Sequence, residues 1–176
     1  MVAEVKLCSL LCQTRRMVEV GERRRIGARG RVALRAAELA TWASRKAGRG
    51  KGSMIGGLVA LKIDPNILGE LGRDRRTVIV TGTNGKSTTT RMTAAALSTL
   101  GDVATQADGA NMDAGIVAAL HAHFDAALAA LEVDELHVPH VADAVDPAAI
   151  VLLNLSRDQL DRVGEINMIE RKLRAG

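Results

Sequence analysis

The sequence of 176 residues is poor in aromatic side chains, with one Phe, one Trp and no Tyr. Proteins that bind single-stranded nucleic acids stack the bases on aromatic rings, so we expect no nucleic acid as the main ligand. The only cysteines are Cys8 and Cys12. Two thiols are too few for a disulfide framework, and a four-ligand zinc site would need further partners. We therefore expect two reduced thiols in a cytoplasmic protein.

Long apolar runs are also missing. A helix that crosses a bilayer requires about 20 consecutive apolar residues, and no stretch of the sequence approaches that length. The short apolar run after Lys6 ends in the polar residues 13–16, so it does not resemble a secretory signal. The sequence therefore predicts no transmembrane segment.

The net charge of +4 is unevenly placed. Residues 1–51 contain 13 Lys and Arg against 4 Asp and Glu, a balance of +9, whereas the remainder contains 11 against 16, a balance of −5. A basic N-terminal part attracts phosphates, nucleic acids or anionic lipids, which allows a peripheral position at the inner membrane face. The alternative is a solvated arm, and we predict that residues 1–30 form a basic extension without fixed structure.

Two further segments follow from the pattern of apolar residues. We predict that residues 31–73 contain an amphipathic helix over 31–47, a possible strand over 58–63 and a short helix capped by Asp64. The apolar positions of the first helix share one side: Val32, Ala36, Leu39, Ala40 and Ala43. Residues 74–176 form the other segment.

Strand and helix patterns alternate through this last segment. The predicted strands are 77–81, 103–105, 126–133 and 150–154, and the predicted helices are 86–100, 112–123 and 142–145. Such alternation implies right-handed βαβ units. The predicted fold class is therefore α/β, with a mostly parallel sheet.

A glycine-rich loop, Gly-Thr-Asn-Gly-Lys-Ser at residues 82–87, follows the β-branched strand 77–81 and opens a helix. Gly82 and Gly85 allow the backbone to approach a phosphate without a Cβ in the way. The backbone N–H groups and the helix N-terminus supply positive potential. The loop is shorter than the common P-loop, which would have glycine in place of Val80. The alternative is a simple turn with an incidental Lys-Ser pair.

The side chains that end this loop fit Mg-ATP. Lys86 can reach the β and γ phosphates, and the Ser87 hydroxyl can bind magnesium. Thr88 follows and can either contact the nucleotide or cap the helix. The loop therefore predicts an ATP site with magnesium.

Polar residues also follow the other predicted strands, whose carboxyl ends form the ligand-binding edge of an open α/β sheet. Glu132 comes directly after an apolar run and can hold magnesium, although a solvated acidic turn is the alternative. Asp134 and Glu135 leave both interpretations open. Asn154 closes the fourth predicted strand, on the same sheet edge as the phosphate loop. Asn111 lies in a loop at a strand exit, where a simple turn is equally compatible with the sequence.

Several of these segments resemble a known family. Residues 81–89 resemble the ATP loop of the Mur ligases and of the related folylpolyglutamate synthases. Residues 109–112, 131–135 and 154–162 resemble the MurT branch, the ligase-like subunits of lipid II isoglutaminyl synthases. The resemblance covers about residues 31–170, and it implies that residues 74–176 form a central ATP-binding domain that is incomplete.

This resemblance implies an ATP-dependent carbon–nitrogen ligase of peptidoglycan synthesis. MurT-like subunits activate the α-carboxylate of the D-isoglutamyl residue of lipid II through an acyl phosphate, and a GatD-like glutaminase supplies ammonia. Two alternatives stay open: a non-catalytic nucleotide-binding or interaction fragment, and a relative of the folylpolyglutamate synthases.

The resemblance also assigns roles to residues. Lys86 and Glu132 would be catalytic, and Ser87 and Glu132 would hold magnesium. The implied nucleotide-binding residues are Gly82, Thr83, Asn84, Gly85, Lys86, Ser87, Thr88, Asn111, Asn154, Asp158 and Asp161. Gln159 stands where many Mur ligases have a histidine that binds a second magnesium, so a second metal is left open.

Length is the largest departure from the family. The relatives continue through a zinc-binding insertion and a C-terminal domain that closes over ATP and contacts the glutaminase. Zinc is expected for the full-length proteins, but its cysteine ligands are absent here. We therefore expect this chain to bind Mg-ATP weakly and not to amidate lipid II alone.

Overall fold

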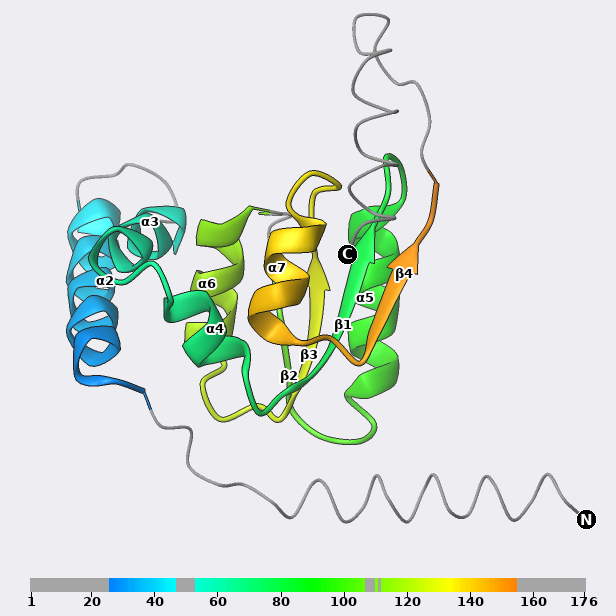
Figure 1. The fold of residues 1–176 in the computed structure, drawn as a ribbon, viewed down its shortest axis with the longest axis horizontal. Coiled ribbons are helices and arrows are strands. Elements are labelled where there is room, and N and C mark those ends of the chain that lie inside the picture. Colours follow the sequence, from blue (N-terminus) through cyan, green and yellow to red (C-terminus); the bar gives the residue numbers. More distant parts are fainter. Residues whose placement is uncertain (1–25, 47–52, 107–109, 111, 155–176) are drawn as a thin grey trace, which may run out of the picture.

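The computed structural model describes residues 26–46, 53–106, 110 and 112–154 (Figure 1). In chain order the elements are α2 (Ala28–Lys46), α3 (Ser53–Ile63), α4 (Ile67–Gly72), β1 (Arg76–Thr81), α5 (Lys86–Leu97), β2 (Val103–Thr105), α6 (Asp113–Ala122), β3 (Leu128–Glu132), α7 (Val138–Val145) and β4 (Ala149–Leu152). In this part of the chain, no helix is long and apolar enough to cross a membrane.

The four strands form one sheet in the order β2-β3-β1-β4, and every neighbouring pair is parallel. The prediction of an α/β fold with a mostly parallel sheet is therefore confirmed. Helix α5 lies on one face, and α6 and α7 lie on the other (Figure 1). Because both faces are covered, β1 and β3 are composed largely of apolar or β-branched residues.

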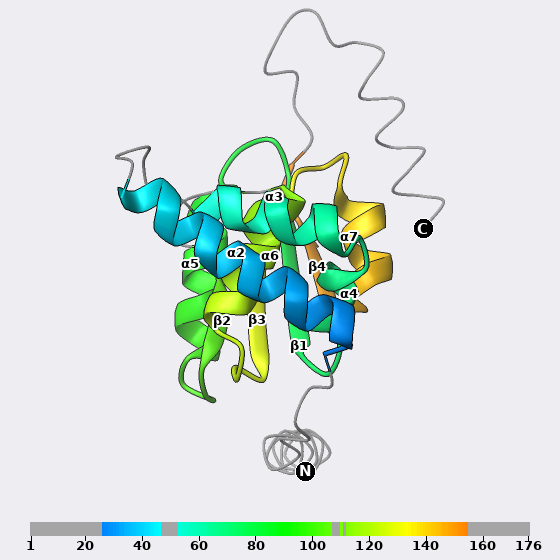
Figure 2. The same ribbon diagram turned by 90° about the vertical axis from the view of Figure 1, so that its left-hand side faces the viewer.

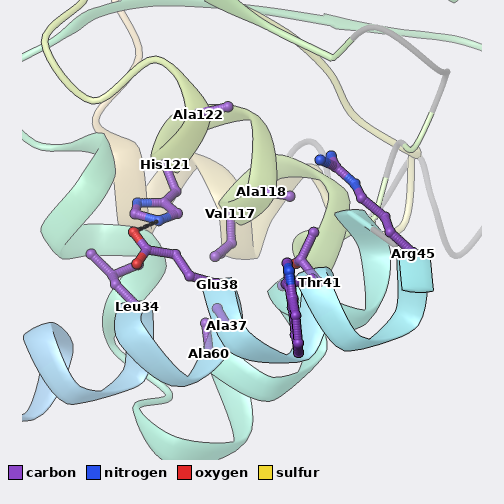
Figure 3. A pocket seen from close by; sticks show the side chains of 13 residues that line it. Leu34, Ala37, Glu38, Thr41, Arg45, Ala60, Val117, Ala118, His121 and Ala122 are labelled. Carbon is purple, nitrogen blue, oxygen red and sulfur yellow. Dashed lines mark ion pairs between the residues drawn. The ribbon is translucent and has the colours of Figure 1, made fainter. Parts of the chain in front are cut away.

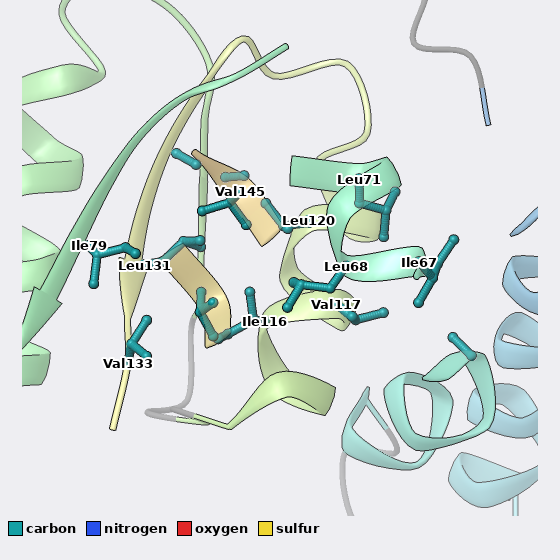
Figure 4. Close-up of a cluster of buried hydrophobic side chains, with 14 of the residues drawn as sticks. Ile67, Leu68, Leu71, Ile79, Ile116, Val117, Leu120, Leu131, Val133 and Val145 are labelled. Atoms are coloured by element: carbon teal, nitrogen blue, oxygen red, sulfur yellow. The ribbon is translucent and has the colours of Figure 1, made fainter. Parts of the chain in front are cut away.

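The hydrophobic core lies between the sheet and the helices α4, α6 and α7 (Figure 4). Its largest fully buried side chains include Ile67, Leu71, Ile79, Ile116, Leu120 and Leu131. Burying one such side chain contributes about 1.5–3 kcal/mol. Ala33 and Leu34 of α2 and Ala60 of α3 belong to the same cluster. The core therefore joins the N-terminal helices to the sheet, while the predicted division at residue 73 stays a prediction.

The predicted strand over 58–63 is wrong, because these residues lie in α3. Gly56, Gly57 and Ala60 are buried at helical spacing. A Cβ on Gly57 would lie 1.9 Å from the carbonyl oxygen of Ala114 in α6. Close helix–helix packing therefore selects a helix here, although the short apolar run alone is compatible with either element.

The predicted helix over 31–47 is confirmed, with its start at Ala28. Its apolar side is not the buried side, however. Val32 is 62% exposed and Leu39 is 68% exposed. The residues of α2 that are buried are smaller: Gly30, Ala33, Leu34, Ala37 and Ser44. Small residues let α2 approach α3 closely, so the larger apolar side chains remain outside.

Two other predicted helices differ in detail. The helix after Asp64 begins only at Ile67, and the Asp64 carboxylate instead accepts a hydrogen bond from the Asn66 N–H at 3.0 Å. Helix α7 begins at Val138 rather than at residue 142, with a proline in its first turn. That position suits proline, because the N–H groups of a first helical turn have no intrahelical acceptor.

Candidate functional site

The candidate site lies at the carboxyl edge of the sheet. Strands β1 and β3 are parallel neighbours, and their register places Val80 beside Glu132. The loop after β1 and the segment after β3 consequently leave the sheet side by side (Figure 1). An open α/β sheet binds ligands at this edge, so the fold brings two of the predicted site segments together.

Gly82 gives the phosphate loop its shape. Its φ is 135°, a conformation that residues with a Cβ rarely adopt. A Cβ on Gly82 would also lie 2.9 Å from both the backbone N and the carbonyl oxygen of Asn154. At the other end of the loop, Gly85 has a φ of 86° and is the N-cap of α5. The predicted sequence of strand, tight turn and helix is therefore confirmed.

Asn154 fastens this loop to the end of β4. Its Oδ1 accepts a hydrogen bond from the Asn84 N–H at 3.0 Å, and its Nδ2 donates to the Asn84 carbonyl at 2.9 Å. The Thr83 N–H donates to the Asn154 carbonyl at 2.9 Å. Asn154 thus binds the loop backbone, and its predicted contact with a nucleotide stays a prediction.

Lys86, the first residue of α5, turns back over the loop. Its Nζ donates to the carbonyls of Gly82 and Thr83, and it lies 3.6 Å from the Glu135 carboxylate. The Lys86 and Glu135 side chains are only 14% and 12% exposed. The sequence left the role of Glu135 open, and the structure brings it to the site as the counter-ion of Lys86.

Ser87 and Thr88 are exposed in the first turn of α5. The first N–H groups of a helix have no intrahelical acceptor and carry the positive end of the helix dipole. This end of α5 therefore presents both hydroxyl groups and backbone donors next to Lys86, which is the chemistry that an anionic phosphate requires.

Gln106 holds Glu132 in place, and the sequence did not reveal it. The Gln106 Nε2 donates to the Glu132 carbonyl at 2.8 Å, and the Glu132 N–H donates to Gln106 Oε1 at 3.0 Å. Gln106 is 8% exposed and Glu132 is 5% exposed. Its position directly after β2 was the available signal, because a polar residue there lies at the same sheet edge.

The residues at this edge fit magnesium held together with phosphate. Glu132 is 5% exposed, and within the described ranges no Lys, Arg or His forms an ion pair with its carboxylate. A weakly solvated carboxylate without a cation is unfavourable, and magnesium prefers such oxygen ligands. No group of three or more His, Cys, Asp or Glu in the described part of the chain could bind a metal by itself. Ser87 and Glu132 would therefore need phosphate and water oxygens to complete the shell.

Three predicted site residues lie outside the described residues: Asn111, Asp158 and Asp161. Their roles stay predictions. The other predicted residues gather around the loop and β3, as the sequence patterns indicated.

Known proteins are similar to this chain in sequence. The family model of the Mur ligase middle domain matches residues 80–174. The chain is 41% identical over 122 residues to the lipid II isoglutaminyl synthase (glutamine-hydrolyzing) subunit MurT of Streptococcus pneumoniae, covering 66% of this chain and 27% of that protein. It is 36% identical over 142 residues to the MurT subunit of Staphylococcus aureus, covering 78% of this chain and 32% of that protein.

A third relative is a ligase by its name. The UDP-N-acetylmuramoylalanine–D-glutamate ligase of Nocardia farcinica is 40% identical over 93 residues, covering 53% of this chain and 19% of that protein. The chain spans about a third or less of the length of these relatives. The family match nevertheless covers more than half of the chain and includes the phosphate loop and β3. The chain therefore belongs to the Mur ligase middle-domain family.

Proposed function

We propose that this chain is the nucleotide-binding part of a MurT-type ligase subunit. Such a subunit uses ATP to activate the α-carboxylate of the D-isoglutamyl residue of lipid II for amidation, in the cytoplasm. The proposal rests on the sheet edge, where Lys86 of the phosphate loop lies 3.6 Å from the Glu135 carboxylate. Glu132 lies at the same edge, beside Val80 at the end of β1. The similarity to two MurT subunits supports the choice of substrate.

The proposed roles follow from charge and position. Lys86 neutralises the β and γ phosphates, while Ser87 and Glu132 hold the magnesium ion. Magnesium, when bound, supplies further charge neutralisation on the phosphates. Phosphoryl transfer depends mainly on positioning and on charge stabilisation, so the site requires no protein nucleophile. The remaining proposed nucleotide contacts are Gly82, Thr83, Asn84, Gly85, Thr88, Asn111, Asn154, Asp158 and Asp161.

The amidation also requires a source of ammonia. We propose that a GatD-like glutaminase supplies it and that ammonia displaces phosphate from the activated carboxylate. The printed names of the MurT relatives describe glutamine-hydrolysing enzymes, which supports such a partner. We propose a zinc site only for the longer relatives, because a structural zinc ion needs four ligands and this sequence has two cysteines.

Calorimetric titration with a slowly hydrolysed ATP analogue, with and without magnesium, tests the nucleotide site. We expect binding that depends on magnesium. Lys86→Ala should weaken it about 100-fold, because a partly buried cation that binds phosphate contributes about 3 kcal/mol. Arg91→Ala is the matched control, since it removes an exposed cation from the same helix and should leave the affinity within about twofold.

Nucleotide binding and ligase activity, the two parts of the proposal, are tested separately. A folded chain that binds no nucleotide contradicts the ATP site itself. For the reaction, the chain is incubated with a GatD-like glutaminase, glutamine, ATP and lipid II, and the lipid is analysed by mass spectrometry. Replacement of a carboxyl OH by NH2 supports the ligase. Magnesium-dependent nucleotide binding without that product, even when the C-terminal domain of a MurT relative is added in trans, supports the non-catalytic alternative for this chain.

A further inference from the structure

The outer face of α2 exposes large apolar side chains. Val32, Leu39 and Trp42 are 62%, 68% and 60% exposed. Their spacing of seven and three residues places them on neighbouring positions of one helix face. Figure 2 looks onto this helix, which lies in front of α3 and α6. Exposed apolar residues of soluble proteins are normally isolated from one another, so a contiguous strip of them indicates an interaction surface.

Cations flank this apolar strip. Arg31 and Arg35 line a shallow surface groove together with Val32 and Leu39. Next to the strip, Lys46 Nζ lies 5.0 Å from the centre of the Trp42 ring. Helix α2 carries five basic residues and a single acidic one. The strip therefore combines apolar area with positive charge.

The single acidic residue of α2 is already paired. Glu38 lies 3.1 Å from Arg35 and 3.3 Å from His121 of α6. It therefore does not offset the charge of Arg31 or Lys46. A partner for this face should accordingly carry negative charge and accept apolar side chains.

Apolar surface also continues behind the strip. A cavity of about 310 Å³ lies between α2, α3 and α6, and Trp42 is one of its lining residues. Leu34, Ala37 and Val117 give it mainly apolar walls, with the Glu38–His121 pair at one side (Figure 3). An acyl chain that passed Trp42 would consequently find further apolar contacts.

We propose that the outer face of α2 binds the surface of an anionic lipid bilayer. A helix with an apolar strip, flanking cations and a tryptophan is typical of segments that lie in the plane of a membrane interface. The inner side of α2 is held by the core, so the outer strip can enter the interface while the fold remains intact. A second copy of the chain fits less well, because it would bring like charges together. The proposal goes beyond the nucleotide site and does not depend on it.

The chain carries its own reporter for this surface. Trp42 is the single tryptophan and the sequence has no tyrosine, so the intrinsic fluorescence comes from this face. The full chain is titrated with phosphatidylglycerol–phosphatidylcholine vesicles and with vesicles of phosphatidylcholine alone. We expect a blue shift and co-sedimentation with the anionic vesicles, both weakened by high salt, and neither with the neutral ones.

Leu39→Glu should lower the affinity for anionic vesicles about tenfold or more, since it removes apolar area and adds like charge. Met92→Glu is the matched control, because Met92 is also 68% exposed but lies on α5. It should bind as the parent does. Absence of a shift, equal binding to neutral vesicles or equal effects of the two variants would overturn the proposal. So would a shift that follows protein concentration without vesicles, which indicates self-association.

Discussion

The sheet edge and the outer face of α2 are organised in opposite ways. At the sheet edge, polar groups are held by specific partners: Asn154 binds the phosphate loop, and Gln106 binds Glu132. On α2, large apolar side chains such as Leu39 lie in solvent with the core behind them. The proposed binding at the sheet edge depends on exact geometry, whereas the proposed binding at α2 depends on exposed apolar area and positive charge. Small geometric changes should therefore matter greatly at the sheet edge, whereas substitutions on the outer face of α2 should have little effect on folding.

The largest effect is expected at Gly82. Gly82→Ala forces a Cβ into a rarely adopted conformation and within 2.9 Å of the Asn154 backbone. We expect a loss of about 3 kcal/mol in the free energy of unfolding. Displacement of the loop should also weaken Mg-ATP binding by more than about 100-fold. Denaturant unfolding and calorimetry measure the two effects.

Gly101→Ala provides the control for this prediction. Gly101 has a φ of 154°, but a Cβ there would meet no atom within 4 Å. It therefore imposes backbone strain without a clash, at about 1–2 kcal/mol, and nucleotide binding should be unchanged. If Gly82→Ala behaved like Gly101→Ala, the close contact with Asn154 would have no role in shaping the loop.

Gln106 should show the next largest effect. Gln106→Leu removes two buried hydrogen bonds to the Glu132 backbone, so we expect a loss of about 2–3 kcal/mol in the free energy of unfolding. Magnesium should also promote nucleotide binding less, because the backbone that carries the Glu132 carboxylate is no longer held by Gln106. Chemical denaturation and titration at several magnesium concentrations measure these effects.

Thr105→Val is the neighbouring control. Among the described residues the buried Thr105 hydroxyl has no hydrogen-bond partner, so its removal should be neutral or slightly stabilising. A similar loss of stability in both variants would show that general packing at the end of β2, and not the Gln106 bonds, stabilises this edge.

The sequence predicted those features that depend on neighbouring residues. The loop at Gly82 and the α/β alternation follow from turn chemistry and from local patterns of apolar residues. The buried side of α2 and the helix at α3 were missed, because they depend on packing between distant segments. At Gly57 the deciding contact is Ala114, far away in the sequence.

The same limit applies within the site. Glu132 was identified because a carboxylate after an apolar strand is visible in the sequence. Its partner Gln106 is 26 residues away, and no local pattern links the two. Asn154 was chosen for its strand-end position, but its bonds to Asn84 span 70 residues. Sequence position predicts which residues reach the edge, and only the fold shows what they contact there.

Variants of Asn154 test how much nucleotide binding depends on a phosphate loop that is ordered before the nucleotide binds. Asn154→Ala removes two hydrogen bonds from an exposed side chain, so the free energy of unfolding should fall by about 1 kcal/mol or less. Mg-ATP affinity should fall about tenfold, because the loop must then be ordered on binding. Asn154→Asp keeps the acceptor for the Asn84 N–H and should give an intermediate affinity. Equal affinities for all three proteins would show that the Asn154 hydrogen bonds to the phosphate loop do not influence nucleotide binding.

The smallest effect is expected on α2. Val32→Ser replaces an apolar side chain that is 62% exposed, so the free energy of unfolding should change by less than about 0.5 kcal/mol. Ala60→Ser is the matched substitution at a position with 0% exposure, where the new hydroxyl should cost about 1–2 kcal/mol. Denaturant unfolding without lipid compares them. A loss of more than about 1 kcal/mol for Val32→Ser would mean that another part of the chain covers this face, and the contrast with the sheet edge would then fail.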